Sequence, residues 1–292
     1  MKKILLILIS FYLISCEDPI DIEIENGESQ LVVEAILTNS LKEQKVILSK
    51  SGNYFDPIFN EVRNAEISIL DNQGNVIKLE NNNSSTYSFN PTELPFQDDL
   101  TYTLEIIYDN NTFTSLSKLK PVPPIDSITW FKEKVLFGDL DSIIIAQFWA
   151  YDLPGLGDTY WIRSKINGTY LDNISIAYDG STGSGSSSDN IPFIAPVRFS
   201  ITPNSSDEED VLKYGDEIEV ELYSISTEFA NFWKILGDQI NNGGLFATPP
   251  TNVPTNIKNI NINGPKAIGW FEISNISTDS ATITRDKTNN KE

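Results

Sequence analysis

The chain has 292 residues, with 41 acidic and 21 basic side chains and a formal net charge of −20. The phosphate backbone of a nucleic acid repels a chain with this much negative charge. We therefore expect no nucleic-acid partner. The absence of histidine and the presence of one cysteine exclude Ser-His-Asp and Cys-His triads, zinc sites with histidine or several thiolates, and disulfide exchange. We therefore expect no cofactor, no catalytic residue and no enzymatic activity, although carboxylate-based hydrolysis stays open.

The first 15 residues, MKKILLILISFYLIS, have the charged start and short apolar run of a signal peptide. The run from Ile4 to Ile14 covers about half of a ~30 Å hydrocarbon core, so we do not expect it to span a membrane. The next residue is Cys16, and Leu13-Ile14-Ser15-Cys16 resembles the bacterial lipobox. That resemblance implies cleavage before Cys16 and acylation by palmitate-like chains, which together anchor a protein stably. The alternative is a secreted protein whose cysteine lies near a cleavage site.

The first half of the chain predicts an antiparallel β-sandwich, immunoglobulin-like or transthyretin-like, over residues 31–118. An acidic tether, residues 16–30, comes before it. Short β-rich segments separated by turns are typical of such a fold; they lie at 31–38, 45–51, 65–71, 86–89, 100–108 and 112–115. Three prolines in 119–126 then predict a semi-rigid connector.

The second half, residues 127–292, predicts a second β-rich domain with one amphipathic helix. Strands are expected at 127–131, 142–152, 159–167, 196–201, 217–225, 267–274 and 280–284. Helical spacing of large apolar residues, with Ser226 or Thr227 as a cap, predicts a helix over 227–241. Two loops, 179–190 and 248–258, are the expected contact surfaces, because loops on a rigid sandwich commonly carry binding.

Several motifs in order resemble a family of lipoproteins from Bacteroidota, "domain of unknown function 4249". They are LVVEAILT (31–38) after the lipobox, AEISILDNQG (65–74), LTYTLEI (100–106), PVPPIDSI (121–128), NFWKIL (231–236), PPTNVPTNI (249–257) and IGWFEIS (268–274). The resemblance covers nearly the whole mature chain. The motifs are structural, and the family has no established activity, cofactor or catalytic residue to carry over.

The resemblance implies a lipid-anchored outer-membrane protein, often associated with TonB-dependent transporters of the SusC type. Glu17 and Asp18, directly after Cys16, resemble the surface-export signal of that phylum, which favours the cell surface over the periplasmic face. We therefore expect a binding protein that acts with such a transporter as an accessory or ligand-capturing partner. The alternative is a structural or adhesive lipoprotein that binds glycans or matrix without import.

Aromatic residues of the second half are the first candidate site. Trp149, Tyr151, Tyr160 and Trp161, with Trp130 nearby in sequence, could form a stacking platform for flat ligands, or they could fill a core. The acids 207–210 with Asp216 offer oxygen ligands but lack the spacing of an EF-hand, so we expect a solvated turn and no metal. Ser164 and Lys165 point to opposite faces of a strand, which disfavours a Ser-Lys dyad.

Overall fold

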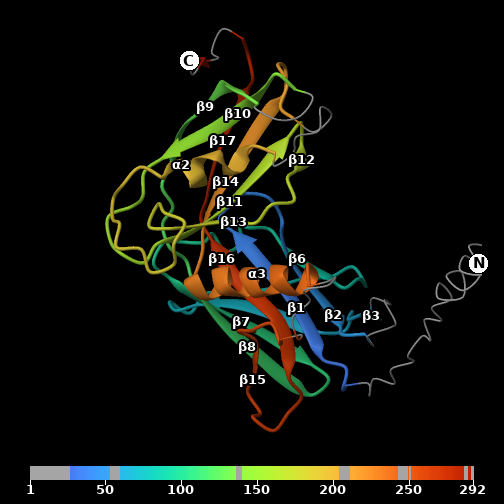
Figure 1. The fold of residues 1–292 in the computed structure, drawn as a ribbon. Helices are drawn as coiled ribbons and strands as arrows, with labels where there is room; N and C mark the ends of the chain where they lie inside the picture. Colours follow the sequence, from blue (N-terminus) through green and yellow to red (C-terminus); the bar gives the residue numbers. More distant parts are fainter. Residues whose placement is uncertain are drawn as a thin grey trace, which may run out of the picture.

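The computed structural model describes residues 27–52, 60–135, 140–203, 211–242, 249, 251–285 and 289–290. The prediction of a mainly β protein is confirmed. Figure 1 shows two β-rich parts, one above the other, with a single long helix at their junction. Within the described residues, none of the helices has the length and hydrophobicity needed to cross a bilayer.

Two sheets enclose the first core. One contains β1 (Leu31–Thr38), β2 (Gln44–Lys50), β3 (Asn60–Glu61), β6 (Thr86–Phe89) and β16 (Ala267–Ser274). The other contains β4 (Glu66–Asp71), β5 (Val76–Lys78), β7 (Thr101–Tyr108), β8 (Asn111–Lys118) and β15 (Lys258–Asn259). Every second residue is buried along β1 and along β7 as far as Ile106, so the alternation in the sequence does mark the face of each strand that packs inward.

A late part of the chain returns to this first sandwich. β16 pairs in parallel with β1 over its whole length, whereas the sequence predicts only antiparallel neighbours. The predicted limits of 31–118 and 127–292 place the two parts one after the other, but β15 and β16 belong to the sheets of the first part. Close approach of β1 and β16 requires Gly269, whose φ is +103° and whose added Cβ would overlap the Val33 carbonyl oxygen.

The second sandwich also has two sheets. One contains β9 (Ile125–Lys134), β10 (Ser142–Ala150) and β18 (Asn289–Asn290), and the other contains β11 (Thr159–Ile166), β12 (Thr169–Tyr170), β13 (Ser175–Tyr178), β14 (Glu217–Ser224) and β17 (Ile276–Thr282). Phe148, Tyr160 and Leu222 are fully buried between them. The core is therefore built from the alternate residues of long strands, as in the first sandwich.

The strand expected at 196–201 is wrong. This segment forms a short helix, α2 (Ala195–Arg198), followed by one 3₁₀ turn, η1 (Phe199–Ile201). Pro196 lies in the first turn, where its missing N–H costs nothing. Val197 and Ile201, about one helical turn apart, are both buried in the second core, so the inward face of this segment packs against the sandwich.

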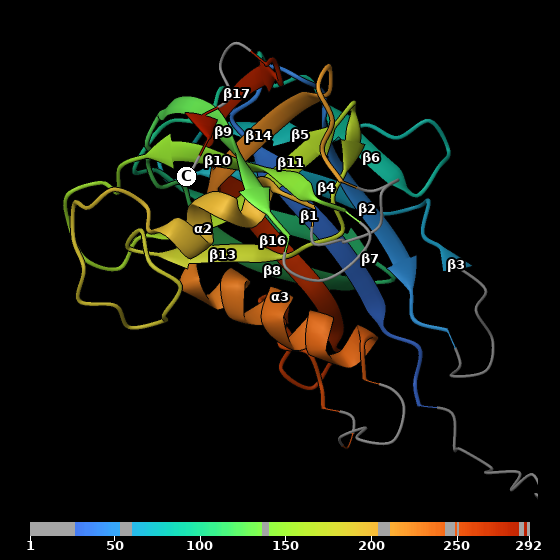
Figure 2. The same cartoon turned by 45° about the horizontal axis from the view of Figure 1, so that its top comes forward.

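The helix predicted at 227–241 is confirmed as α3 (Thr227–Ile240). The Ser226 hydroxyl accepts a hydrogen bond from the Phe229 N–H and caps its first turn. Figures 1 and 2 show α3 lying across β1 and β16, beside the junction of the two parts. Phe229 and Phe232 of α3 pack there against Trp161 of the second sandwich and Trp270 of the first. We call this aromatic cluster, with Tyr223, Ile225 and Ala230, the joint.

A buried glutamate ties the helix to the joint. Glu272 of β16 is 2% exposed and accepts hydrogen bonds from the Ser226 N–H, the Ser226 hydroxyl and the Trp270 indole. Burial raises the pKa of Glu272 from 4.5 to about 7, although these three donors oppose the rise. The folded protein therefore holds this proton more tightly than the unfolded chain does.

We expect the Glu272→Gln variant to lose part of the pH dependence of stability. Proton uptake by Glu272 favours folding, so its contribution is complete below pH 4.5 and is lost as the pH rises through about 7. The loss amounts to about 3 kcal/mol of unfolding free energy in the wild type. Urea unfolding from pH 5 to pH 8 should show a shallower decline in the variant. Glu66→Gln, an exposed change in β4, should leave the wild-type slope; equal slopes in all three proteins would contradict the assignment.

Candidate functional site

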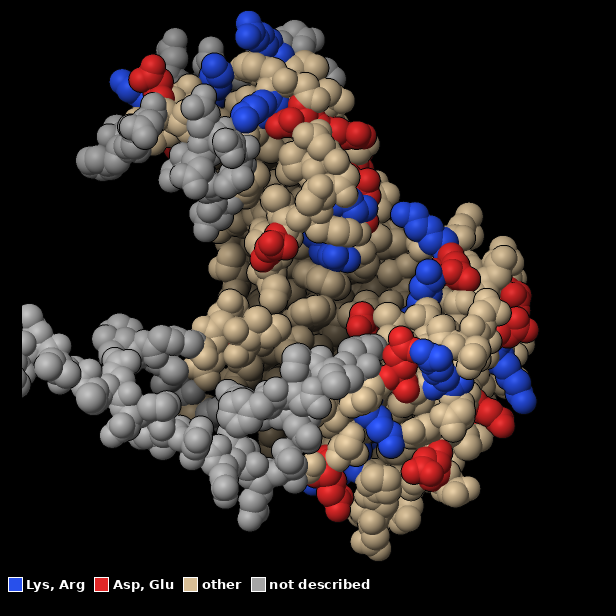
Figure 3. Space-filling view, turned by 90° about the vertical axis from the view of Figure 1, so that its right-hand side faces the viewer, with Lys and Arg blue, Asp and Glu red and all other residues tan. Residues whose placement is uncertain are grey.

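A polar cleft lies between the two sandwiches. Its volume is about 640 Å³, and one wall is formed by β1, by the start of β2 and by the turn between them, residues 39–43. The opposite wall is the outer face of the second sandwich, with Tyr170, Glu219, Glu221 and Tyr223. Figure 3 shows this side of the molecule hollowed between an upper and a lower part, with acidic and basic side chains around the hollow.

Strand alternation builds the wall of the second sandwich. Glu219, Glu221 and Tyr223 are spaced by two on β14, so they share one face. The antiparallel register of β11 places Lys165 opposite Glu219 and Arg163 opposite Glu221. The alternation of these residues along each strand can be seen in the sequence. The pairing of β11 with β14 cannot, and it is this pairing that brings Lys165 and Glu219, 54 residues apart, together.

Lys165 joins the two glutamates. Its Nζ donates to Glu219 Oε1 at 2.5 Å and to Glu221 Oε1 at 2.7 Å. Glu221 also accepts the Tyr223 hydroxyl at 2.8 Å and the Tyr170 hydroxyl at 3.0 Å. The side chain of Glu221 is 5% exposed and that of Lys165 is 13% exposed, whereas Glu219 is 40% exposed. Glu219 is therefore the member of the group that presents a carboxylate oxygen to the cleft.

Hydrogen bonding keeps this group ionised. Burial alone would raise the pKa of Glu221, but the donors Lys165, Tyr223 and Tyr170 outweigh it, and the pKa lies below its usual value. Burial would lower the pKa of Lys165, yet the bonds to Glu219 and Glu221 raise it. A general acid needs a raised carboxyl pKa, so Glu221 is unsuited to that role. The cleft is better suited to hold a polar ligand than to transfer protons.

Tyr170 is stacked rather than free. The guanidinium carbon of Arg163 lies 3.8 Å from the centre of the Tyr170 ring and 4.9 Å from that of Trp161. Lys165 Nζ lies 4.6 Å from the same tyrosine ring. Cations therefore already occupy the aromatic surface at this wall. Recognition in the cleft has to depend on hydrogen bonds and charge more than on stacking.

Gln44 shapes the opposite wall. This side chain is 5% exposed, accepts the Thr38 N–H at 2.7 Å and donates to the Lys42 carbonyl at 2.7 Å. One buried amide thus fixes the turn between β1 and β2 that borders the cleft. Leu41, at the tip of this turn, is 85% exposed.

A second hollow, of about 740 Å³, lies between α3 and the strands β1 and β16. Apolar side chains make up most of its lining, among them Val32, Phe232, Trp233, Leu236 and Trp270. It adjoins the joint, so its shape depends on the packing of α3.

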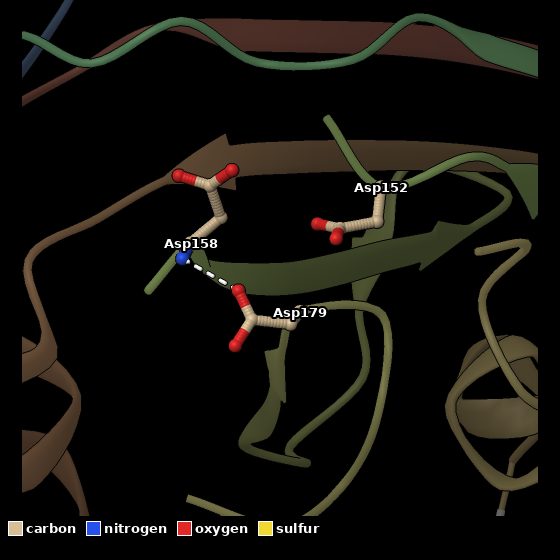
Figure 4. A group of neighbouring side chains, drawn as sticks. All are labelled: Asp152, Asp158 and Asp179. Atoms are coloured by element: carbon tan, nitrogen blue, oxygen red, sulfur yellow. Dashed lines mark hydrogen bonds between the residues drawn. The ribbon is translucent and has the colours of Figure 1, made fainter. Parts of the chain in front are cut away.

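Three aspartates meet at one end of the second sandwich. Asp152 follows β10, Asp158 precedes β11 and Asp179 follows β13, and carboxylate oxygens of all three lie within 4.8 Å of one another. Asp179 accepts the N–H groups of Gly157 and Asp158, each at 2.8 Å, and Asp152 accepts the Tyr160 hydroxyl at 2.9 Å. Figure 4 shows the three side chains converging from separate strands, with the bond from the Asp158 N–H to Asp179.

The aspartate cluster concentrates negative charge in a partly buried place. Burial raises the pKa of Asp152, and it raises that of Asp158, to which the charge of Asp179 adds while Lys120 opposes. Three carboxylates in this arrangement could hold a hard cation such as Ca²⁺. The sequence did not indicate the cluster because its members are 6 and 21 residues apart, although each lies at a strand end.

The predicted aromatic platform is not assembled. Trp130 and Tyr160 are buried in the second core and Trp161 in the joint, at 2%, 1% and 7% exposure. Trp149 is half-buried, donates its indole N–H to Thr129 and carries Arg198 over its ring at 4.0 Å. Tyr151 alone is well exposed, at 56%. The members thus lie in different surroundings, and ligand binding by Trp149 or Tyr151 stays a prediction.

The other predicted positions have mixed outcomes. Cys16, Glu17 and Asp18 lie outside the described residues, as do the acids 207–210. Asp216 accepts hydrogen bonds from Asn167 and from the Lys213 N–H. Ser164 is buried whereas Lys165 pairs with Glu219 and Glu221 on the outer face of the sheet, so the two do point apart as expected.

The two predicted contact loops also have structural contacts. In the loop 248–258, the Asn256 side chain pairs with both the N–H and the C=O of Phe271 and covers the free edge of β16. In the loop 179–190, Asp189 accepts the Gly155 N–H at 2.7 Å. The described parts of both loops therefore stabilise the fold, whatever else they contact.

Residues 17–280 match the family described as a domain of unknown function, DUF4249, and the chain belongs to that family. No curated protein matches the chain. Among solved structures, it has a likeness to a structure concerned with host cell surface retention of a 1.5-MDa bacterial ice-binding adhesin, with 10% identity and a TM-score of 0.19. The alignment covers 91% of this chain and 66% of the adhesin chain, just under two thirds. A TM-score this low establishes no shared fold.

We expect Lys165→Met to lower the unfolding free energy by about 3 kcal/mol at neutral pH, because it leaves the buried Glu221 carboxylate without its cation. The double variant Lys165→Met/Glu221→Gln should recover much of this loss, since it removes the uncompensated charge. Urea unfolding gives both values. Lys45→Met breaks an exposed ion pair with Glu43 and should cost less than about 1 kcal/mol. A Lys165 variant no less stable than this control would contradict the role given to the pair.

We expect Asp158→Asn to raise the melting temperature in the presence of a chelator by about 2 °C, because it removes one of three close negative charges. Asp172→Asn, at an exposed position, should leave the melting temperature unchanged. Calorimetry with added CaCl₂ distinguishes cation binding from simple repulsion. If the cluster holds Ca²⁺, the wild type gains stability on addition and the Asp158 variant gains none; a variant less stable than the wild type in chelator would contradict the expected repulsion.

Proposed function

We propose that this protein is a lipid-anchored binding protein of the outer membrane that captures a polar ligand for a TonB-dependent transporter of the SusC type. The observation that carries the binding role is the cleft between the sandwiches. Its walls are held by the Lys165–Glu221 group on one side and by Gln44 on the other. Such a preformed cavity, bordered by fixed polar groups, is typical of ligand sites.

The cellular setting of the proposal comes from the sequence. The lipobox pattern ending at Cys16 supports acylation, and Glu17 with Asp18 support export to the cell surface. Membership of the DUF4249 family supports the outer membrane of Bacteroidota and a transporter partner through the resemblance described above. The adhesive alternative shares the anchor and differs only in lacking a transporter.

We expect Cys16→Ser to move the protein from the membrane fraction to the soluble fraction, because the thiol is the attachment point for the lipid. Replacing Glu17 and Asp18 by their amides should keep membrane attachment while reducing cleavage by protease added to intact cells. Affinity capture of the acylated protein from gently solubilised outer membrane should recover a TonB-dependent transporter. Retention of the Cys16 variant in the membrane would refute the anchor; capture without a transporter would refute the uptake role and favour adhesion.

A further inference from the structure

The loop between β15 and β16 carries two solvent-exposed isoleucines. Ile260 is 67% exposed and Ile262 is 93% exposed. Figure 1 shows this loop as the lowest projection of the molecule, and on the face seen in Figure 3 the lowest projection shows no charged side chain. Single exposed apolar residues are common on protein surfaces. Two large aliphatic side chains close together at a protruding tip instead indicate a contact surface.

Hydrogen bonds hold this tip in shape. The Asn259 side chain donates to Asn111 Oδ1 at 3.1 Å and to the Pro265 carbonyl at 2.9 Å. Its carbonyl oxygen accepts the Asn261 N–H at 3.0 Å. Gly264 leaves room for this amide, which a Cβ there would meet at 2.5 Å. The isoleucines are therefore fixed outward instead of folding back onto the sandwich.

The tip lies at the end of the molecule where the chain enters from its N-terminus. Leu31, the first residue of β1, is in register with Ala267, which directly follows the loop. The segment 16–30 that precedes Leu31 is the predicted tether to the lipid on Cys16. Fifteen extended residues reach about 50 Å, so the tether alone does not hold the protein against the surface.

Charged side chains of both signs surround the tip. Lys258 and Lys266 flank the loop, and Lys50 is in register with Leu31 on the neighbouring strand. Four acids lie at the same end through the registers of β4, β7 and β8 and through the segment before β1: Glu28, Glu66, Glu105 and Asp109. These seven residues carry a net charge of only −1 in a chain of net charge −20, so an anionic lipid surface repels this end weakly and the lysines beside the loop can face its anionic groups.

We propose that residues 259–266 dock on the lipid surface, with Ile260 and Ile262 entering the headgroup region and Lys258 and Lys266 facing its anionic groups. Shallow insertion of apolar side chains flanked by lysines is the usual physical basis of peripheral membrane contact. The docking goes beyond the proposed ligand capture and depends on the proposed anchor only for bringing this end to the membrane.

Hydrogen exchange on tethered protein tests this docking. Because Cys16 is the only cysteine, the mature chain can be coupled through it to a maleimide phospholipid in vesicles of phosphatidylcholine and phosphatidylglycerol. The backbone amides of 261–264 should exchange about threefold or more slowly on vesicles than in solution. Equal rates in the two states would overturn the proposal and leave a protein partner as the occupant of the tip.

Matched variants separate docking from tethering. The Ile260→Ser/Ile262→Ser variant should lose the slowing, whereas Leu156→Ser, at a 69% exposed position on the second sandwich, should keep it. Slowing that persists without the isoleucines would also overturn the proposal. Chemical coupling makes the result independent of acylation in the cell, which the fractionation of Cys16→Ser tests separately.

Discussion

The arrangement of the molecule depends on one run of chain that belongs to both sandwiches. β16 pairs with β1 in the first sandwich, and after a single residue, Asn275, β17 pairs with β14 in the second. Asn275 is 6% exposed, its side chain donates to Asp98 and to the Lys120 carbonyl, and its own carbonyl accepts the Ser224 N–H. Because the crossing is one residue long and is hydrogen-bonded on both sides, it restricts the movement of one sandwich relative to the other.

This crossing explains why the cleft is a defined feature and not a variable gap between two domains. One wall comes from β1, which is bound along its length to β16, and the other comes from β14, which is bound to β17. The joint braces the same region from the side, where rings of Trp161 and Trp270 pack on α3. A ligand site composed of two sandwiches can therefore be preorganised, which reduces the ordering cost of binding.

The sequence predicts what is local and misses what is distant. Alternation located the long strands, and apolar spacing with a Ser226 cap located α3, because these signals depend on neighbours in sequence. The parallel pairing of β1 with β16 joins residues more than 200 positions apart, and the sequence shows only a glycine, Gly269, inside the predicted strand 267–274. The segment 196–201 was misjudged because its β-branched content outweighed the proline that begins a helix.

The candidate sites also combine residues that the sequence shows with pairings that only the structure shows. Glu219, Glu221 and Lys165 were each visible on alternating strands, but their grouping needs the β11–β14 register. The tip of 259–266 has no periodicity at all, so its meaning comes only from its position at the entry of the chain. In Figures 1 and 3 the tip is at the lower end, whereas the cleft opens on a side face between the two parts. A protein docked by its tip would therefore keep the cleft uncovered by lipid, so that anchoring and ligand capture use separate surfaces of the molecule.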